Sequence, residues 1–373
     1  MTEAELLTYR IAFSRIKGMT VGAARHLLDA LGSEEAFFRL DLREIERLTG
    51  LGSRHFKDGM REELLVRARE EVRFVTANSV RCLYFTGEEF PRRLLECEDA
   101  PLLLYARGDC DLNARHVVGI VGTRNATHYG VNFINKLVDD LAERLEGLLI
   151  VSGLALGCDV TAHRRAMAVG IPTAGIVAHG LDMMYPAENR NDAARMALGA
   201  GMVLTDYPSN TRPFRGNFLA RNRIVAGMVD CLVVAESAAD HGGALHTARL
   251  AREYDREVFA LPGRTSDHYS GGCNRLIRRQ IAVLCGGADD IMDTMGWSGR
   301  PVEGAQQELF RSFSPEERMI VDYLTMNGEG QINPLCAHTG IPVGRLMGML
   351  MELETVWLWR CPVRVTGLPD IPG

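Results

Sequence analysis

The sequence predicts an α/β protein whose central domain contains a doubly wound, mostly parallel sheet. Two observations support this fold class. Between residues 80 and 295, short apolar runs such as VVGIVG, LLIVSG, TAGIVAHG and CLVVAES each end in small or polar residues. Helical stretches such as NFINKLVDDLAERLEG lie between most of these runs. Because parallel neighbouring strands need a crossover, the alternation favours a Rossmann-like sheet with helices on both faces.

The amino-terminal residues 1–77 show helical periodicity and no convincing strand, which predicts a small helical domain. The piece LTGLG, Leu48 to Gly52, has the h-x-G-h-G spacing of a helix-hairpin-helix. In that motif the glycines allow backbone N–H groups at a helix start to approach a phosphate. Two tight turns in a SAM-like helical bundle would have the same spacing, so both interpretations stay open.

The sheet domain is expected over residues 78–296, and the stretch RCLYFTGEEFPRRLLECEDAPLLLYARGD looks like an extension of it. The Gly-, Ser- and Pro-containing segment WSGRPVEGAQQ predicts a linker over 297–308. Residues 309–373 contain the helix-start signal Ser-Pro-Glu-Glu (314–317), then three short helical patterns and a strand pair around WLWRCPVRV. That order predicts a winged-helix domain.

Composition and charge exclude several classes of protein. No apolar run of the roughly 18 residues needed to span a bilayer is present. The acidic start MTEAELLTYRIAF lacks the features of a secretory signal, so we expect a cytoplasmic protein with no membrane partner. The nine cysteines contain no C-x-x-C pair, which disfavours zinc ribbons and disulfide frameworks. The net charge of −6 argues against nucleic acid, but nearly all the basic residues are arginines, which suit phosphate.

The turns after the strands are the candidate site, because ligands of doubly wound sheets bind beyond the carboxyl ends of strands. The first turn, in GIVGTRNATHYG, departs from the dinucleotide fingerprint G-x-G-x-x-G because Thr123 and Arg124 follow Gly122. We interpret it as a phosphate cradle in which Thr123 and the turn amides donate hydrogen bonds and Arg124 adds charge. Gly242 and Gly243, which precede a helix, would present further amides to a phosphate.

The stretch RPFRGNFLARNR carries the strongest indication of nucleic-acid binding. Its four arginines accompany two phenylalanines, and the stretch contains no acid. Arginines that face phosphates beside an aromatic ring for base stacking are typical of single-stranded nucleic-acid sites. A solvated loop before an ordinary helix is the alternative, although cationic residues at a helix amino end favour a bound anion. The candidate residues are Arg212, Arg215, Asn217, Phe218, Arg221, Asn222 and Arg223.

Asp159 and His163 lie four residues apart on one expected helix, so both project from the same face. A metal or acid–base pair is one interpretation. We favour the other, in which the aspartate braces the helix start and the histidine packs in the neighbouring turn. No metal and no cofactor are therefore expected.

Six motifs in this order resemble the DNA-processing protein A family, also called DprA or Smf. They are GTR (122–124), SGLALGCDVTAH (152–163), GLDMMYPAENR (180–190), F-x-x-RNR (218–223), GGALHTAR (242–249) and PG followed by GCNRLI (262–277). The resemblance implies a non-enzymatic, single-stranded DNA-binding protein of natural transformation. Such a protein protects incoming strands and helps to load the recombinase RecA, displacing or bypassing single-strand-binding protein. It also implies a homodimer formed through the Rossmann-like domain.

The resemblance further implies roles for individual residues. Arg124 and Arg215 would contact DNA phosphate, Phe218 would stack on a base, and Arg221 and Arg223 would belong to the same basic rim. If about six phosphates are neutralised, the logarithmic salt slope would be near −4, a loss of roughly 300-fold in affinity between 50 and 200 mM salt.

The sequence departs from the family pattern in three places. Leu156 stands where relatives often have an arginine, and GGALHTAR replaces a more usual SGSL-type start. The helix VGRLMGMLMELE carries Arg345 against Glu352 and Glu354. A helix of that charge is a poor reader of duplex DNA, so we assign it to protein contacts or packing.

Two enzymatic alternatives remain. A nucleotide-binding hydrolase of the phosphoribohydrolase type would use the same turns, but GGALHTAR offers Arg249 where that class has a carboxylate. A nicotinamide dehydrogenase is the less favoured alternative. The second strand of the expected βαβ unit in this sequence ends in Val151-Ser152-Gly153, without the acidic residue that would bind a ribose hydroxyl.

Overall fold

The computed structural model describes residues 1–50, 58–199, 201–239, 242–298, 314–327, 329–356 and 364–366. It divides into two compact units, Met1–Arg300 and Pro301–Gly373. Within the described ranges, no helix combines the length and apolar composition needed to cross a bilayer. The same ranges contain no group of three or more His, Cys, Asp or Glu side chains arranged to hold a metal ion.

Within residues 1–50 and 58–77, the structure describes five helices: α1 (Glu3–Ser14), α2 (Val21–Leu31), α3 (Glu34–Arg39), α4 (Leu42–Thr49) and α5 (Asp58–Ala77). Each of the first four begins at a Thr, Ser or Asp whose side chain accepts a hydrogen bond from a first-turn N–H. Phe13 and Phe37 pack edge to face, with ring centroids 5.4 Å apart, in the core between these helices. The expected helical character is therefore confirmed.

The proposed helix-hairpin-helix lies only partly within the described residues. Gly50 ends α4 in the left-handed region, at φ +69°, where glycine is favoured. Gly52 falls in residues 51–57, outside the described ranges. The motif stays a prediction.

A nine-stranded sheet follows, in the order β1-β2-β6-β5-β4-β3-β7-β8-β9. Its strands are β1 (Arg81–Tyr84), β2 (Leu103–Gly108), β3 (His116–Val121), β4 (Leu148–Ser152), β5 (Thr173–Ile176), β6 (Gly201–Thr205), β7 (Cys231–Val234), β8 (Glu257–Ala260) and β9 (Val283–Leu284). Strands β3 to β9 pair in parallel, while β1 and β2 extend the sheet with antiparallel pairings. The predicted mostly parallel sheet is confirmed.

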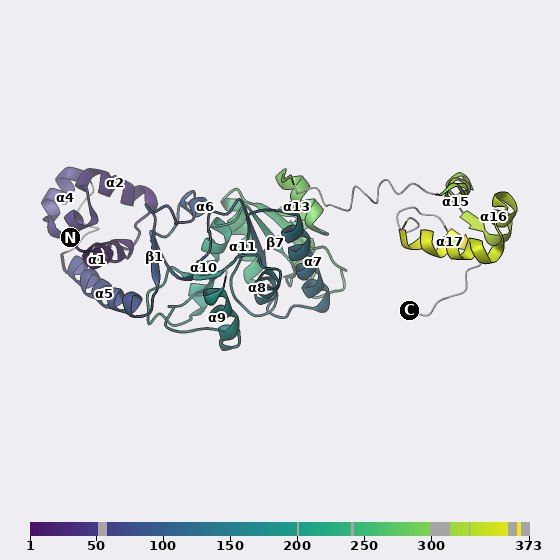
Figure 1. Ribbon diagram of the computed structural model, residues 1–373. Coiled ribbons are helices and arrows are strands. Elements are labelled where there is room, and N and C mark those ends of the chain that lie inside the picture. Colours follow the sequence, from purple (N-terminus) through teal and green to yellow (C-terminus); the bar gives the residue numbers. More distant parts are fainter. Residues whose placement is uncertain are drawn as a thin grey trace. The chain divides into compact units, whose positions relative to one another are not determined.

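Helices cover both faces of this sheet (Figure 1). On β3, Val118 and Ile120 pack with α7 (His128–Arg144), α8 (Cys158–Ala168) and α13 (Ala288–Met295). Val117 and Val121 point to the opposite face, whose cluster includes α10 (Arg215–Gly227), α11 (Gly243–Glu253) and α12 (Gly271–Arg278). This alternation is the period-two pattern of a strand buried on both sides. Helices α6 (Arg92–Leu95) and α9 (Arg190–Leu198) also belong to this region.

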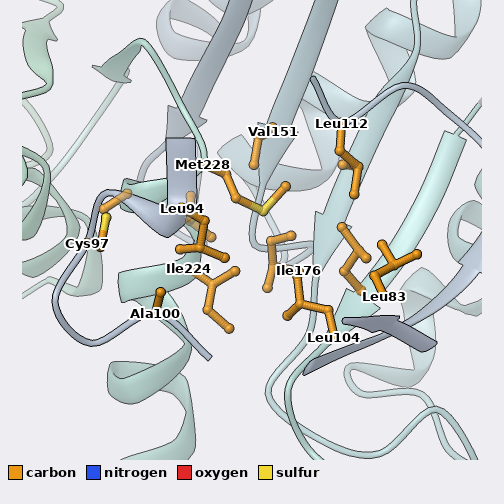
Figure 2. Packing of buried hydrophobic residues seen from close by; sticks show 14 of the residues in the cluster. Leu83, Leu94, Cys97, Ala100, Leu104, Leu112, Val151, Ile176, Ile224 and Met228 are labelled. Carbon is orange, nitrogen blue, oxygen red and sulfur yellow. The ribbon is translucent and has the colours of Figure 1, made fainter. Parts of the chain in front are cut away.

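The core on the second face extends to the segment before the parallel strands. Figure 2 shows Ile224 and Met228, from the end of α10, facing Val151 and Ile176 of the sheet. Leu94 of α6 belongs to the same cluster and is 1% exposed. This packing anchors the carboxyl end of α10 against the sheet.

The strand order creates a crevice beside β3. From β3 the chain runs through β4, β5 and β6 in one direction, and β7 then pairs with the other side of β3. The connections after β3 and β7 therefore leave toward opposite faces of the sheet. Such a topological switch point is where open α/β sheets bind their ligands.

The second unit contains α15 (Pro315–Asn327), β10 (Glu329–Gln331), α16 (Ile332–Thr339), α17 (Val343–Val356) and β11 (Arg364–Thr366). The predicted helix start is confirmed, because Ser314 and Glu317 hydrogen-bond each other's backbone N–H at 3.2 and 2.8 Å. Strands β10 and β11 pair in parallel. Most of WLWRCPVRV and all but the first two residues of the 297–308 linker lie outside the described residues. The winged helix stays a prediction.

Candidate nucleic-acid interface

A cleft of about 770 Å³ lies at the switch point. Its walls are the turns after β3, β4 and β7 and the first halves of α10 and α11. Four arginines line it, namely Arg124, Arg215, Arg221 and Arg249. Asp159 is the sole carboxylate among the described lining residues. A chain with an overall charge of −6 thus carries a locally cationic hollow.

The turn after β3 is shaped by close packing against α8. A Cβ atom at Gly122 would lie 2.4 Å from the Cys158 sulfur, so glycine is required there. The Thr123 N–H donates to the Glu236 carbonyl at 2.8 Å, and the Thr123 carbonyl accepts from the Cys158 N–H at 3.1 Å. The N–H of Thr123 is thus hydrogen-bonded within the protein, whereas the sequence predicted that it would donate to a phosphate. Arg124 is exposed and lines the cleft.

The amino end of α7 is also occupied, by the side chain of Glu236. The Thr127 N–H and hydroxyl donate to the two carboxylate oxygens of Glu236, at 2.8 and 2.5 Å. A Cβ atom at Gly130 would lie 2.4 Å from one of those oxygens, so the first turn of α7 is moulded around this carboxylate. In dinucleotide-binding proteins the pyrophosphate sits at this helix end. Here an internal anion, 3% exposed, takes that place.

Glu236 was not among the expected site residues. It directly follows the apolar run CLVVA, and an acidic residue at the end of an expected strand is the one feature of the sequence that indicates a role in the site. Its partner Thr127 lies 109 residues earlier, however, and only the parallel pairing of β3 with β7 brings the two together.

Arg221 forms part of the floor of the cleft rather than a basic rim. It is 5% exposed and its guanidinium donates to the Ile176 carbonyl. Burial lowers the pKa of Arg221, and the charge of Asp159 opposes that effect. Burial likewise raises the pKa of the Asp159 carboxyl, against the opposing charge of Arg221. Gly153 makes room for the pair, since a Cβ atom there would lie 2.2 Å from the Arg221 guanidinium.

The Asp159 and His163 side chains do not work as a pair. Asp159 accepts a hydrogen bond from the Ala155 N–H at 3.4 Å, as expected for a residue that braces a helix start. His163 is fully buried, bonds the Thr173 hydroxyl at 2.7 Å, and has its pKa lowered to about 3 by burial. It does not line the cleft. The packing interpretation holds for this histidine.

Arg124, Arg215 and Phe218 all line the cleft. The guanidinium carbon of Arg124 lies 5.4 Å from the centroid of the Phe218 ring, in a cation–π arrangement. The Tyr185 ring lies on Phe218 as well, with centroids 5.7 Å apart. Phe218 is half-buried, so its ring is held in place by its neighbours while part of it stays accessible.

Two helix amino ends open into the cleft. Helix α11 begins after Gly242 and α10 after Phe214, and neither has a side-chain cap or an acid in its first turn. Gly242 and Gly243 are exposed and line the cleft, and the Asn222 side-chain amide donates to the Gly243 carbonyl at 3.4 Å. Uncapped amides at two helix ends attract anions.

Three of the expected residues lie elsewhere. Arg223 donates to the Asp206 carboxylate at 2.6 Å and to the Asp99 carbonyl, beside a separate cavity of about 180 Å³. The Asn217 amide donates to the carbonyls of Ala178 and Arg212, at 3.5 and 3.3 Å, so it braces the loop before α10. Arg212 is exposed. None of Arg212, Asn217 and Arg223 lines the cleft.

Comparisons with known proteins match the sheet domain to one family. The family model for DNA recombination-mediator protein A matches residues 81–296. The DNA processing protein DprA of Bacillus subtilis is 36% identical over 217 residues, which cover 58% of this chain and 71% of that protein. The crystal structure of DNA processing protein A from Streptococcus pneumoniae superposes with a TM-score of 0.64 at 29% identity, covering 79% of this chain and 98% of the other.

A second solved structure is DNA processing protein A from Helicobacter pylori, described for its single-stranded DNA binding mode. It superposes with a TM-score of 0.51 at 31% identity and covers 58% of this chain and 95% of that one. The family match spans more than half of the 373 residues, including the whole sheet and its cleft. The chain therefore belongs to the DNA recombination-mediator protein A family.

Proposed function

We propose that the cleft binds single-stranded DNA and that the protein acts in the cytoplasm as a recombination mediator. In natural transformation it would protect incoming single strands and help to load RecA recombinase onto them. The observation that carries the proposal is the cleft lining, in which four arginines and two open helix ends face one carboxylate that is already engaged by Arg221. Backbone phosphates are the ligand that such a lining fits best.

The aromatic residue in the cleft favours an unpaired strand. Phe218 lines the cleft beside Arg124, and a base can reach its ring only when it is not paired within a duplex. Stacking on an aromatic ring is tolerant of sequence, because every base has a π-face. We therefore expect little base preference.

The cleft offers poor chemistry for a hydrolase. N-glycosidic cleavage needs a carboxylate free to act, whereas Asp159 is buried against Arg221. Arg249 occupies the segment in which the phosphoribohydrolase alternative has its acid. For a nicotinamide enzyme, Glu236 already fills the helix end that a pyrophosphate would use. We infer that the protein is not an enzyme.

Self-association through the sheet would use its β9 edge. This strand ends the sheet order, and its Val283 and Leu284 side chains are 40% and 50% exposed. An exposed apolar edge strand is a ready surface for pairing with a second copy. We propose a homodimer of this kind, with RecA as a partner and single-strand-binding protein as the protein that it displaces or bypasses.

The experiment is fluorescence anisotropy with labelled single- and double-stranded oligonucleotides across a salt series, beside sedimentation to count protomers. Tighter binding of the single strand, weakened by salt, supports the proposal. Equal affinity for both forms at low salt would rule out a single-strand site. Release of free base from AMP or CMP would instead favour the hydrolase.

A further inference from the structure

The α11 wall of the cleft carries two basic side chains that no described residue neutralises. His246 and Arg249 both line the cleft, and their spacing of three residues places them on one face of the helix. His246 is half-buried and Arg249 is exposed. Among the described residues, neither side chain has an ion pair or hydrogen bond, whereas Arg252 on the next turn pairs with Glu257.

These side chains stand beside an open helix end. Helix α11 spans 11 residues and begins at Gly243, where no side chain caps the first N–H groups. The Thr247 hydroxyl donates to the Gly243 carbonyl at 3.0 Å and does not cap the first N–H groups. Partial positive charge from the helix dipole therefore adds to that of the two side chains at the same place.

A buried polar atom in the same cleft independently indicates a ligand. The Nε atom of Arg221 is buried and has no hydrogen-bond partner among the described residues, although Arg221 lines the cleft and is 5% exposed. An unsatisfied donor on a buried guanidinium is costly. An anion bound in the cleft, which Arg221 lines, would supply an acceptor for this guanidinium.

We propose that α11 forms a second phosphate subsite of the single-stranded DNA cleft, in which the open amides, Arg249 and the protonated imidazole of His246 hold a backbone phosphate. The inference rests on the proposed function and adds residues that lie outside the arginine- and phenylalanine-rich stretch before and within α10. His246 acts here as a binding residue whose charge depends on pH.

Proton uptake follows from this geometry. The charged groups that share the cleft with His246 are Arg124 from the β3 turn, Arg215 and Arg221 from α10, Arg249 from α11 and Asp159 from α8, and Tyr269 is a further titratable group there. A phosphate seated against α11 stabilises the imidazolium form of His246 over the neutral form. DNA binding then takes up a proton from solvent onto His246 wherever the free imidazole is mostly neutral, so affinity rises as pH falls.

The test measures the dissociation constant of a labelled oligo-dT by anisotropy from pH 8.5 to 5.5 at constant ionic strength. We expect wild-type affinity to rise about three- to tenfold over this range, as one linked proton allows. In His246→Gln that rise should disappear. Arg249→Gln should weaken binding at every pH and reduce the magnitude of the salt slope by about 0.7, as the loss of one phosphate contact predicts.

The matched control is His128→Gln, because His128 is exposed at the first position of α7, another helix amino end, and does not line the cleft. It should keep the wild-type pH dependence. A direct measurement of proton uptake in weakly buffered wild-type protein on adding oligo-dT checks the same linkage without a variant. An unchanged pH profile in His246→Gln, or no proton uptake, overturns the inference. Absence of wild-type oligo-dT binding at every pH would instead overturn the proposed function.

Discussion

Replacing Arg124 by alanine should weaken single-stranded DNA binding and reduce its dependence on salt. Arg124, Arg215 and Arg249 are the exposed guanidinium groups of the cleft, whereas Arg221 is buried beside Asp159. If each exposed group neutralises one phosphate, the logarithmic salt slope is near −2.1, and affinity falls roughly 20-fold between 50 and 200 mM salt. With Arg124 removed, the slope becomes about −1.4 and the loss roughly sevenfold. The lost charge-assisted contact is worth about 1.5–3 kcal/mol, which corresponds to a ten- to hundredfold weaker complex at low salt.

The assay is anisotropy with labelled oligo-dT at four or more salt concentrations, on wild type, Arg124→Ala and a control. Arg165→Ala is a suitable control, because Arg165 lies on α8, pairs with Asp139 at 2.5 Å and does not line the cleft. The control should keep both affinity and slope. The reasoning fails if Arg124→Ala binds as tightly as wild type, or if the two variants lose affinity equally.

Three further predictions concern other residues. Phe218→Ala should cost about 1–3 kcal/mol of oligo-dT binding with an unchanged salt slope, and a changed slope would contradict a purely stacking role. Glu236→Gln should lower the free energy of unfolding by about 1–3 kcal/mol in urea titrations, since the helix end that Thr127 begins loses its anion, and an unaltered midpoint would refute this. Because burial holds the pKa of His163 near 3, below the 6.5 of the unfolded chain, the unfolded state binds an extra proton below pH 6.5. The free energy of unfolding should therefore fall by about 1.4 kcal/mol per pH unit from pH 6.5 downward, and less steeply in His163→Gln.

The sheet and the location of its cleft could be predicted from sequence because both depend on local patterns. Apolar runs such as HVVGIV and LLIVS are buried along their whole length, as parallel strands require. Parallel strands end at one edge, so turns that are far apart in sequence, at Gly122 and Gly242, converge there. Arg124, Arg215 and Phe218 follow from this convergence together with the family motifs.

The different positions of Arg221 and Arg223 were not anticipated, although helical geometry contains the information. Two residues apart on an α-helix differ in direction by about 200°, so the two arginines must face opposite sides of α10. Phe218, Arg221, Asn222 and Val225 share the 3–4 spacing of one helix face, and all four line the cleft. A count of charges along the stretch gives Arg221 and Arg223 the same weight, so it does not show that they face opposite sides of α10.

The expected number of phosphate contacts also changes for a physical reason. A slope near −4 assumed about six neutralised phosphates, but charge that is already paired within the protein releases few counterions. Arg223 pairs with Asp206, 2.6 Å away, and the Thr123 amide is held by Glu236. Fewer cationic groups are therefore free to meet DNA than the sequence contains, and the predicted slope is correspondingly shallower.

Glu236 gives a physical reason why a doubly wound sheet, a fold that commonly binds nucleotides, could bind a DNA strand instead. In a doubly wound sheet the first helix end would attract any nucleotide phosphate, but a buried carboxylate here satisfies the Thr127 N–H and hydroxyl. The uncapped helix ends that line the cleft belong to α10 and α11, which pack against each other and share it with Phe218. A mononucleotide can occupy one of these ends at a time, whereas a strand can engage both through successive phosphates and place a base on the ring between them. We therefore expect a strand to bind more tightly than a nucleotide, because a strand can use two weak anion sites, each of which alone would bind a free phosphate poorly.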